Sequence, residues 1–165
     1  MKQIKLTQGQ YALVDDEDFD ELNQYKWCAN YHYNSYYVVR HTPTINGERK
    51  MIYMHRLIMN ALNGLQVDHI NHNTLDNRKQ NLRICTNSQN HMNRKPRKNT
   101  SSKYKGVSFS KRDKLWQVAI RINGKLIYLG AYKSEIQAAH AYDKQAKELF
   151  GEFALLNFKG INYDK

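Results

Sequence analysis

The residues Asp68, His69, Asn81 and Asn90 are the feature that most constrains this chain. Eleven residues separate His69 from Asn81, and eight more separate Asn81 from Asn90. Together they supply a carboxylate, an imidazole and two carboxamides, which are the parts needed to hold one hard divalent cation beside a general base. A histidine with a pKa near neutrality can take a proton from water.

The surrounding string, VDHINHNTLDNRKQNLRICTNSQNHMN, resembles the HNH nucleases of the phage and homing type. The strings MHRLIM (54–59) and LDNRKQNLR (75–83) are also similar to this family. The resemblance implies a small ββα-metal unit with strands at 66–70 and 81–85, a loop at 71–80 and a helix at about 87–93.

The same resemblance implies roles by position. His69 is the expected general base that activates water, and Asn81 is expected to bond across the loop and keep the imidazole aimed. Asp68 is one expected metal ligand. Asn90 is the second, where the family more often has a histidine. Because an Asn carbonyl oxygen suits Mg²⁺ or Mn²⁺ better than zinc or nickel, Mg²⁺ or Mn²⁺ is the expected cofactor, with no small-molecule cofactor.

Less specific interpretations of these residues stay open. A lone Asp-His pair is usually a polar surface pair, and the chain has 17 asparagines, so an Asn at a given spacing is common. A degenerate nuclease that binds DNA without cutting is another alternative. His55 is either a further active-site or phosphate contact or a core histidine at a helix start, whereas His72 and His91 are expected on a loop and a helix surface.

The positive charge of the chain lies in one stretch. Residues 93–133 carry 12 basic side chains and one acidic side chain, and their net charge of +11 equals that of the whole chain. A localised basic patch is typical of a polyanion binder. The stretch begins with a linker, NRKPRKNTSS (93–102), in which four cations are candidates to follow a phosphate backbone: Arg94, Lys95, Arg97 and Lys98. A solvated tether is the alternative.

Cysteine use and hydropathy exclude several protein classes. The two cysteines, Cys28 and Cys85, lie far apart and form no C-x-x-C pair, which argues against a structural zinc site. No apolar leader follows Met1, and no run of eighteen apolar residues occurs. We expect a soluble, cytoplasmic protein without a membrane partner, in the host bacterial cytoplasm if a phage encodes it.

The C-terminal third alternates like an antiparallel sheet followed by a helix. Strands are expected at 104–109, 116–122 and 125–129, with Asn123-Gly124 as a two-residue hairpin turn. Ser134 and Gln137 predict a capping box for a helix over 135–150 that Gly151 ends. The strings YKGV (104–107), LWQVAIRINGKLIYLGAY (115–132) and EIQAAHAYDKQAKELFGEFALLNF (135–158) closely resemble the Apetala-two/ethylene-response-factor DNA-binding domain.

This second resemblance implies that one sheet face packs on the helix and the other enters the major groove of duplex DNA. Lys105, Trp116, Arg121 and Tyr128 are expected on the DNA face, although a role in the core is the alternative for Trp116. Lys111 and Arg112 in the first hairpin loop are expected to contact phosphates. Three positions depart from the plant domains, which commonly carry Arg or Glu there, and so put the plant target sequence in doubt: Ser108, Ser110 and Ala119.

The N-terminal region reads as short antiparallel strands at 2–6, 11–14, 36–41 and 51–54. The acidic run 15–21 is either a metal site or, as we expect, an acidic turn that caps a one-turn helix at 19–22. Trp27 and four tyrosines are expected to pack the sheet or in part to face DNA: Tyr31, Tyr33, Tyr36 and Tyr37.

The sequence thus predicts an α+β protein with an N-terminal antiparallel strand region, a ββα-metal HNH core and a C-terminal three-stranded sheet packed on one helix. The expected divisions are 1–53, 54–93, a basic linker at 94–102, 103–158 and a tail at 159–165. We expect a divalent-metal-dependent endonuclease that acts on double-stranded DNA, takes its site preference from the C-terminal domain and nicks one strand as a monomer. The alternative is a non-catalytic DNA-binding regulator. The oligomeric state stays open.

Overall fold

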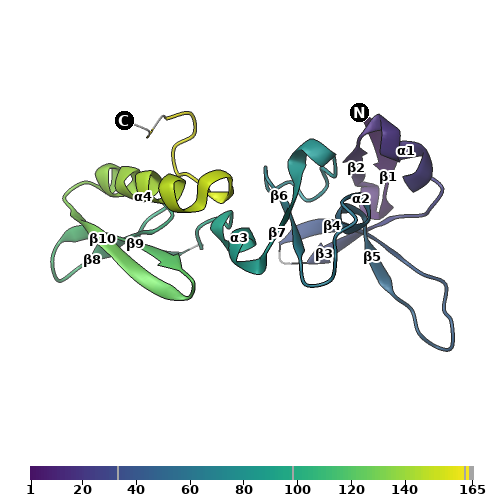
Figure 1. The fold of residues 1–165 in the computed structure, drawn as a ribbon, viewed down its shortest axis with the longest axis horizontal. Helices are drawn as coiled ribbons and strands as arrows, with labels where there is room; N and C mark the ends of the chain where they lie inside the picture. Colours follow the sequence, from purple (N-terminus) through teal and green to yellow (C-terminus); the bar gives the residue numbers. More distant parts are fainter. Residues whose placement is uncertain (33, 98, 162, 164–165) are drawn as a thin grey trace. The chain divides into compact units, whose positions relative to one another are not determined.

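Four small antiparallel sheets and four α-helices make up the residues that the structure, a computed structural model, describes: 1–32, 34–97, 99–161 and 163 (Figure 1). The strand orders are β1-β2, β3-β4-β5, β6-β7 and β10-β9-β8. The chain divides into two units, Met1–Asn87 and Ser88–Lys165. The expected α+β class is confirmed. Within the described residues, no helix has the length and the apolar character that a membrane crossing needs.

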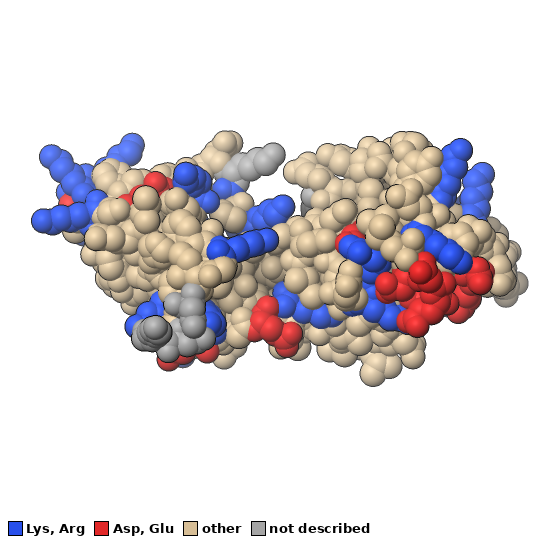
Figure 2. Space-filling view, turned by 90° about the horizontal axis from the view of Figure 1, so that it is seen from above, with Lys and Arg blue, Asp and Glu red and all other residues tan. Residues whose placement is uncertain are grey.

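The first unit begins with a hairpin of β1 (Lys2–Lys5) and β2 (Tyr11–Val14), joined by the 3-10 turn η1 (Thr7–Gly9). Helix α1 (Asp16–Leu22) follows, with three acidic residues in its first turn, where negative charge favours the helix dipole. Acidic side chains of α1 pair with the amino terminus, Lys2 and Lys79, and Figure 2 shows acidic residues gathered in one patch of this unit. The run therefore lies within the helix itself, because α1 begins at Asp16 and not at the predicted residue 19. The predicted cap is wrong as well, since the N-cap residue Asp15 makes no side-chain capping bond.

The second sheet of this unit consists of β3 (Cys28–His32), β4 (Ser35–His41) and β5 (Met51–Tyr53). Strand β3 was not predicted, because Cys-Ala-Asn-Tyr-His lacks the β-branched residues that favour strands. Trp27 is 1% exposed in the core, and its Nε1 donates to the Leu22 carbonyl at 2.8 Å, so its packing role is confirmed. Tyr36 packs on this core, Tyr31 is 58% exposed, and Tyr33 lies outside the described residues.

The predicted ββα segment is present with nearly the expected bounds. Strand β6 (Gln66–His69) pairs with β7 (Leu82–Cys85), and α3 (Asn87–Met92) follows. The short helix α2 (Met54–Ile58) precedes them, and the 3-10 turn η2 (Lys79–Asn81) leads into β7.

The loop between β6 and β7 is bound to the N-terminal sheets. Leu13 on β2 exchanges backbone hydrogen bonds with this loop: its N–H donates to the Leu75 carbonyl, and its carbonyl accepts from the Asn77 N–H, both at 2.8 Å. The Thr74 hydroxyl donates to the Tyr36 carbonyl at 2.6 Å. The N-terminal strands, whose role the sequence did not reveal, therefore hold the loop in place.

The second unit is a three-stranded sheet packed on one helix, as predicted. Its strands are β8 (Val107–Ser110), β9 (Leu115–Ile122) and β10 (Lys125–Tyr132), and its helix is α4 (Glu135–Phe150), followed by the 3-10 turn η3 (Gly151–Phe153). Three alanines at 0% exposure let α4 lie close on the sheet: Ala138, Ala139 and Ala146.

Of the two capping predictions for α4, the one for its C-terminal end is confirmed and the one for its N-terminal end is not. Gly151 ends the helix with a φ of 53°, as expected for a C-terminal glycine. The predicted capping box is wrong. Ser134 is the N-cap residue, but its side chain makes no capping bond, and its backbone carbonyl accepts from Ala138.

A buried carboxylate joins α4 to the C-terminal segment. Asp143 is fully buried, and its oxygens accept from the Asn157 N–H and side-chain amide and from the Phe158 N–H at 2.8 to 2.9 Å. Asn157 also bonds both the N–H and the carbonyl of Lys105 ahead of β8. These bonds satisfy a charge that would otherwise be costly to bury.

Gly106 gives a test of this packing. It has a φ of +76°, and an added Cβ would lie 2.0 Å from the Tyr142 ring, whereas Gly124 has a φ of +79° with open space around it. Gly124→Ala should cost only the left-handed backbone, roughly 1 to 2 kcal/mol. Gly106→Ala should add an overpacking cost of roughly 1 to 3 kcal/mol. Native-state hydrogen exchange of the α4 amides measures the loss in free energy of unfolding for each variant. Equal losses in the two variants would show that the Tyr142 ring moves aside freely.

Candidate active site

His69 lies at the end of β6 and is 5% exposed. Its ring meets the ring of His55 edge to face, with 5.1 Å between the centroids. Burial lowers the pKa of His69 below its usual value, while the side chains of Asn77, Asp68 and Asp76 oppose this shift. The imidazole is therefore held in its neutral form, which is the form that accepts a proton.

Asp68 is the neighbour of His69 on β6 and forms an ion pair across the hairpin. The β6–β7 register sets Asp68 opposite Arg83, and Arg83 Nη2 and Nε donate to Asp68 Oδ2 at 2.7 and 2.9 Å. Both side chains are nearly buried, at 7% and 11% exposure. The sequence interpretation missed Arg83, although the predicted strands at 66–70 and 81–85 already allowed this register.

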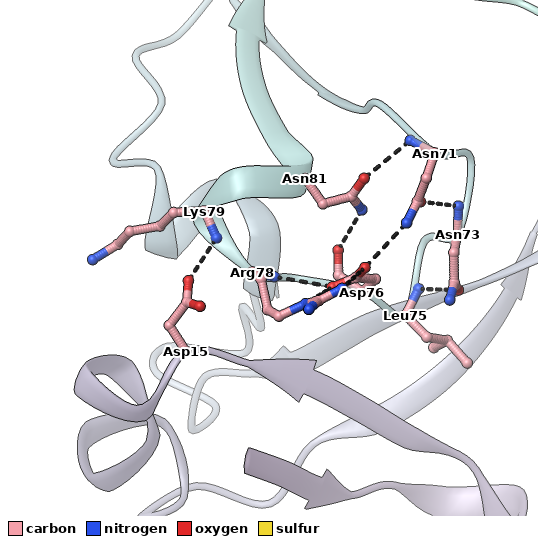
Figure 3. Close-up of polar contacts among 8 residues, drawn as sticks. All are labelled: Asp15, Asn71, Asn73, Leu75, Asp76, Arg78, Lys79 and Asn81. Atoms are coloured by element: carbon pink, nitrogen blue, oxygen red, sulfur yellow. Dashed lines mark hydrogen bonds and ion pairs between the residues drawn. The ribbon is translucent and has the colours of Figure 1, made fainter. Parts of the chain in front are cut away.

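Asn81 bonds across the loop in the expected manner (Figure 3). It is 5% exposed, its Oδ1 accepts from the Asn71 N–H at 3.0 Å, and its Nδ2 donates to the Asp76 carbonyl at 2.8 Å. Its backbone carbonyl also accepts from the N–H of Ile70, the residue after His69. These bonds fix the chain on both sides of the loop at the point where His69 leaves β6.

A second carboxylate, Asp76, organises the interior of the loop (Figure 3). Asp76 is 2% exposed and accepts from Arg78 Nε and Nη2, each at 2.7 Å, and from the Asn71 side chain at 3.0 Å. The hydrogen bonds from Arg78 hold the pKa of this carboxyl below its usual range. The Lys79 N–H donates to Asp15 at 2.7 Å, so the loop is also tied to the start of α1.

His55 lies on α2 and is 7% exposed, so it is a core histidine near a helix start. It is also in contact with the candidate base, because its ring centroid lies 5.1 Å from that of His69; it lies 5.4 Å from that of Tyr53. Burial is the largest cause that lowers the pKa of His55, which falls to about 3. His55 therefore stays neutral and adds no charge beside His69. Whether it contacts a phosphate stays a prediction.

The predicted metal ligands belong to different units. Asp68 lies on β6 in the first unit, and Asn90 lies half-buried on α3 in the second. No group of three or more His, Cys, Asp or Glu side chains that could hold a metal ion occurs in the part of the chain that the structure describes. The predicted ligands Asp68 and Asn90 offer oxygens, which fit Mg²⁺ or Mn²⁺ completed by water and phosphate better than zinc. The ligand role of Asn90 stays a prediction that rests on its spacing from Asn81.

Most of the predicted DNA-contacting side chains in the second unit are exposed. Arg121 and Tyr128 lie on the sheet face opposite α4, and Lys111 and Arg112 lie in the β8–β9 loop, where Arg112 pairs with Asp113 at 2.9 Å. Three linker cations are exposed as well, while Lys98 lies outside the described residues: Arg94, Lys95 and Arg97.

Two residues of the predicted DNA face have other surroundings. The face predicted for Trp116 is wrong, because Trp116 alternates in step with the buried Val118 and Ile120 and packs on the α4 side of the sheet. Lys105 is half-buried, and its Nζ donates to the Met92 carbonyl of α3. Burial lowers the pKa of Lys105 to about 8. Both placements favour roles in the fold.

His72 and His91 lie where the sequence interpretation expected them. His72 is in the loop after β6 with a φ of 63°, and His91 is exposed on α3.

Comparisons with known proteins agree with this geometry. The profile of the HNH endonuclease family matches residues 52–92, which hold α2, the β6–β7 hairpin and α3. An uncharacterized HNH endonuclease of Acanthamoeba polyphaga mimivirus is 33% identical over 155 residues, which cover 90% of this chain and 75% of that protein. Protein 3.8 of Escherichia phage T7 is 32% identical over 91 residues, covering 55% of this chain and 74% of that protein.

The C-terminal region is similar to plant proteins. The APETALA2-like protein 2 of Oryza sativa subsp. indica is 39% identical over 64 residues, which cover 39% of this chain and 15% of the rice protein. No solved structure matches the chain. The match to the viral relative extends over both units, and the family profile falls on the segment that contains His69, Asp68 and Asn81. The chain therefore belongs to the HNH endonuclease family.

Proposed function

We propose that this protein is a divalent-metal-dependent endonuclease that hydrolyses phosphodiester bonds of double-stranded DNA at preferred sites. The observation that carries the proposal is the buried, neutral imidazole of His69, next to a carboxylate and fixed by a hydrogen-bonded loop. Family membership supports the class of reaction.

In the proposed reaction, His69 takes a proton from the attacking water. The water oxygen forms a bond to phosphorus, and the bond from phosphorus to the 3′ oxygen breaks. The proton stays on the imidazole, and the leaving 3′ oxygen takes up a proton from solvent. The expected products are a 5′-phosphate and a 3′-hydroxyl.

Asp68 and Asn90 are the proposed ligands of Mg²⁺ or Mn²⁺. When bound, such a cation would neutralise charge on the phosphate and on the leaving oxygen. Arg83 lies against Asp68 and balances its charge at 2.7 Å. A cation that binds Asp68 must therefore compete with a guanidinium, which favours binding together with a DNA phosphate that can accept from Arg83 instead.

The second unit is the proposed DNA reader. Its region is similar to APETALA2-like proteins, and the basic stretch 93–133 supplies the charge for sequence-independent attraction to phosphates. Exposed Arg94, Lys95 and Arg97 would extend this contact along the backbone. Since each chain offers one His69 site, a monomer would nick one strand.

A non-catalytic DNA-binding regulator is the second candidate. The similarity of the C-terminal region to an ethylene-responsive transcription factor of Arabidopsis thaliana favours it. Metal-dependent strand scission separates the two candidates.

His69→Ala tests the catalytic proposal. Loss of the general base should reduce cleavage of supercoiled plasmid by roughly a hundredfold or more. Gel-shift affinity for the same plasmid should be nearly unchanged, because His69 is buried and carries no charge. His91→Ala, an exposed histidine on α3, is the control and should cleave normally. A His69→Ala variant that cleaves at the normal rate would remove His69 from the reaction.

Asp68→Ala tests the metal proposal. Loss of a carboxylate ligand should raise the Mg²⁺ concentration needed for half-maximal cleavage by about tenfold or more, and additional Mg²⁺ should restore part of the rate. The exposed Asp20 on α1 provides the control, since Asp20→Ala removes the same charge from a site on the surface. Equal Mg²⁺ requirements in the two variants would contradict the ligand role.

Asn81→Ala tests the loop. It removes one buried and one partly buried hydrogen bond and leaves the Asp76 carbonyl and the Asn71 N–H to find other partners, a local cost of roughly 1 to 3 kcal/mol. We expect faster hydrogen exchange at Asn71 and a fall in kcat of about a hundredfold, because His69 loses its fixed position. Asn73→Ala, which removes one exposed turn bond to Leu75, should change both little. Unchanged exchange at Asn71 would show that other contacts hold the loop.

A further inference from the structure

The sheet of the second unit has one face that is open and almost uncharged. Within β9 and β10, the strand register puts six residues there, on the side opposite the buried Val118 and Ile120: Gln117, Ala119, Arg121, Leu126, Tyr128 and Ala131. Leu126 and Tyr128 are 64% and 59% exposed, because α4 covers only the other face of the sheet. We call these six residues the open face.

Positive charge borders the open face and does not cover it. Arg121 is the one charged residue among the six, and its Nη1 donates to the Gly124 carbonyl at 2.7 Å, in the β9–β10 turn. Exposed Lys111, Arg112 and Lys114 lie at one end of β9, and Lys125 lies beside the turn at its other end. A neutral centre with cationic ends matches a DNA groove, in which the bases lie between two phosphate backbones.

The chemistry of the open face favours one class of base pair. In the major groove, guanine is read by Arg or Lys, adenine by Asn or Gln, and the thymine methyl group by apolar side chains. The open face offers three apolar side chains, Ala119, Leu126 and Ala131. Its carboxamide, Gln117, suits adenine, although its Nε2 also donates to Asp113 Oδ2 at 3.4 Å. Its single guanidinium is engaged with the turn.

We propose that the open face selects A·T pairs, with Ala119, Leu126 and Ala131 in contact with thymine methyl groups. This inference rests on the proposed function of the second unit as the DNA reader, and it names the class of sequence which that unit prefers.

The test uses the full chain with His69→Ala, so that the DNA stays intact. Three pools of duplexes share the same flanks and length: cores of random A·T pairs, the same cores with uracil in place of thymine, and cores of random G·C pairs. Uracil keeps every hydrogen-bonding group of thymine and lacks only the methyl group. Binding is measured by titration at one fixed salt concentration.

The A·T pool should bind more tightly than the G·C pool. Uracil should weaken binding by about fourfold for each buried methyl group, the factor that follows from about 0.8 kcal/mol. Leu126→Ser should reduce the ratio between the thymine and uracil affinities. Ala119→Arg should raise affinity for the G·C pool relative to the A·T pool. Leu149→Arg adds the same charge at an exposed site on α4, away from the open face, and should change no ratio.

Each outcome decides between the two proposals. Equal affinity for thymine and uracil pools, with salt-dependent binding to all three, would overturn the thymine inference and leave the DNA reader intact. A preference for thymine that Leu126→Ser and Ala119→Arg do not alter would also overturn it, because another surface would carry the preference. Absence of binding to every pool would also overturn the proposal that the second unit reads DNA. The same conclusion would follow if the protein self-associates through this face and binds no pool.

Discussion

The candidate site depends on the loop between β6 and β7, which has no regular structure before η2 and nevertheless fixes a buried imidazole. Hydrogen bonds among buried polar groups hold such a loop in one conformation. Asp76, at 2% exposure, accepts from Arg78 and Asn71, and Asn81 closes the loop across its two sides. Because His69 stands where this loop leaves β6, its position follows from these bonds rather than from a helix or a long strand.

The second unit uses a buried carboxylate in the same way. Asp143, fully buried on α4, accepts from the backbone of Asn157 and Phe158, and Asn157 in turn bonds Lys105 ahead of β8. In each unit, a buried aspartate therefore fixes by hydrogen bonds the conformation of a segment that apolar contacts alone would not fix. The hydrophobic clusters stabilise the units, and the aspartates determine which arrangement of the chain is adopted.

Local pattern was enough to predict most elements, because turns, alternation and helix ends are coded by neighbouring residues. Helix α4 and the β9–β10 hairpin follow from such signals, whereas the β6–β7 hairpin was expected from the family resemblance. Strand β3 escaped detection because its residues are neither β-branched nor regularly alternating. The face of Trp116 was mispredicted, although its even spacing from Val118 and Ile120 gave the answer. The Asp68–Arg83 pair and the contact of His55 with His69 depend on register and on tertiary packing, which no single segment specifies.

The support that Leu13 and Asp15 give to the loop shows that the family motif and the folding unit are not the same segment of the chain. The family profile spans 52–92, yet the loop inside it is held by a strand and a helix start that lie some sixty residues before it in the chain. A fragment cut to the boundaries of the motif would keep every residue assigned to catalysis and lose the backbone that orders them. In this protein, the family profile locates the candidate catalytic residues. The smallest fragment that folds on its own must also include the N-terminal residues that hold the loop.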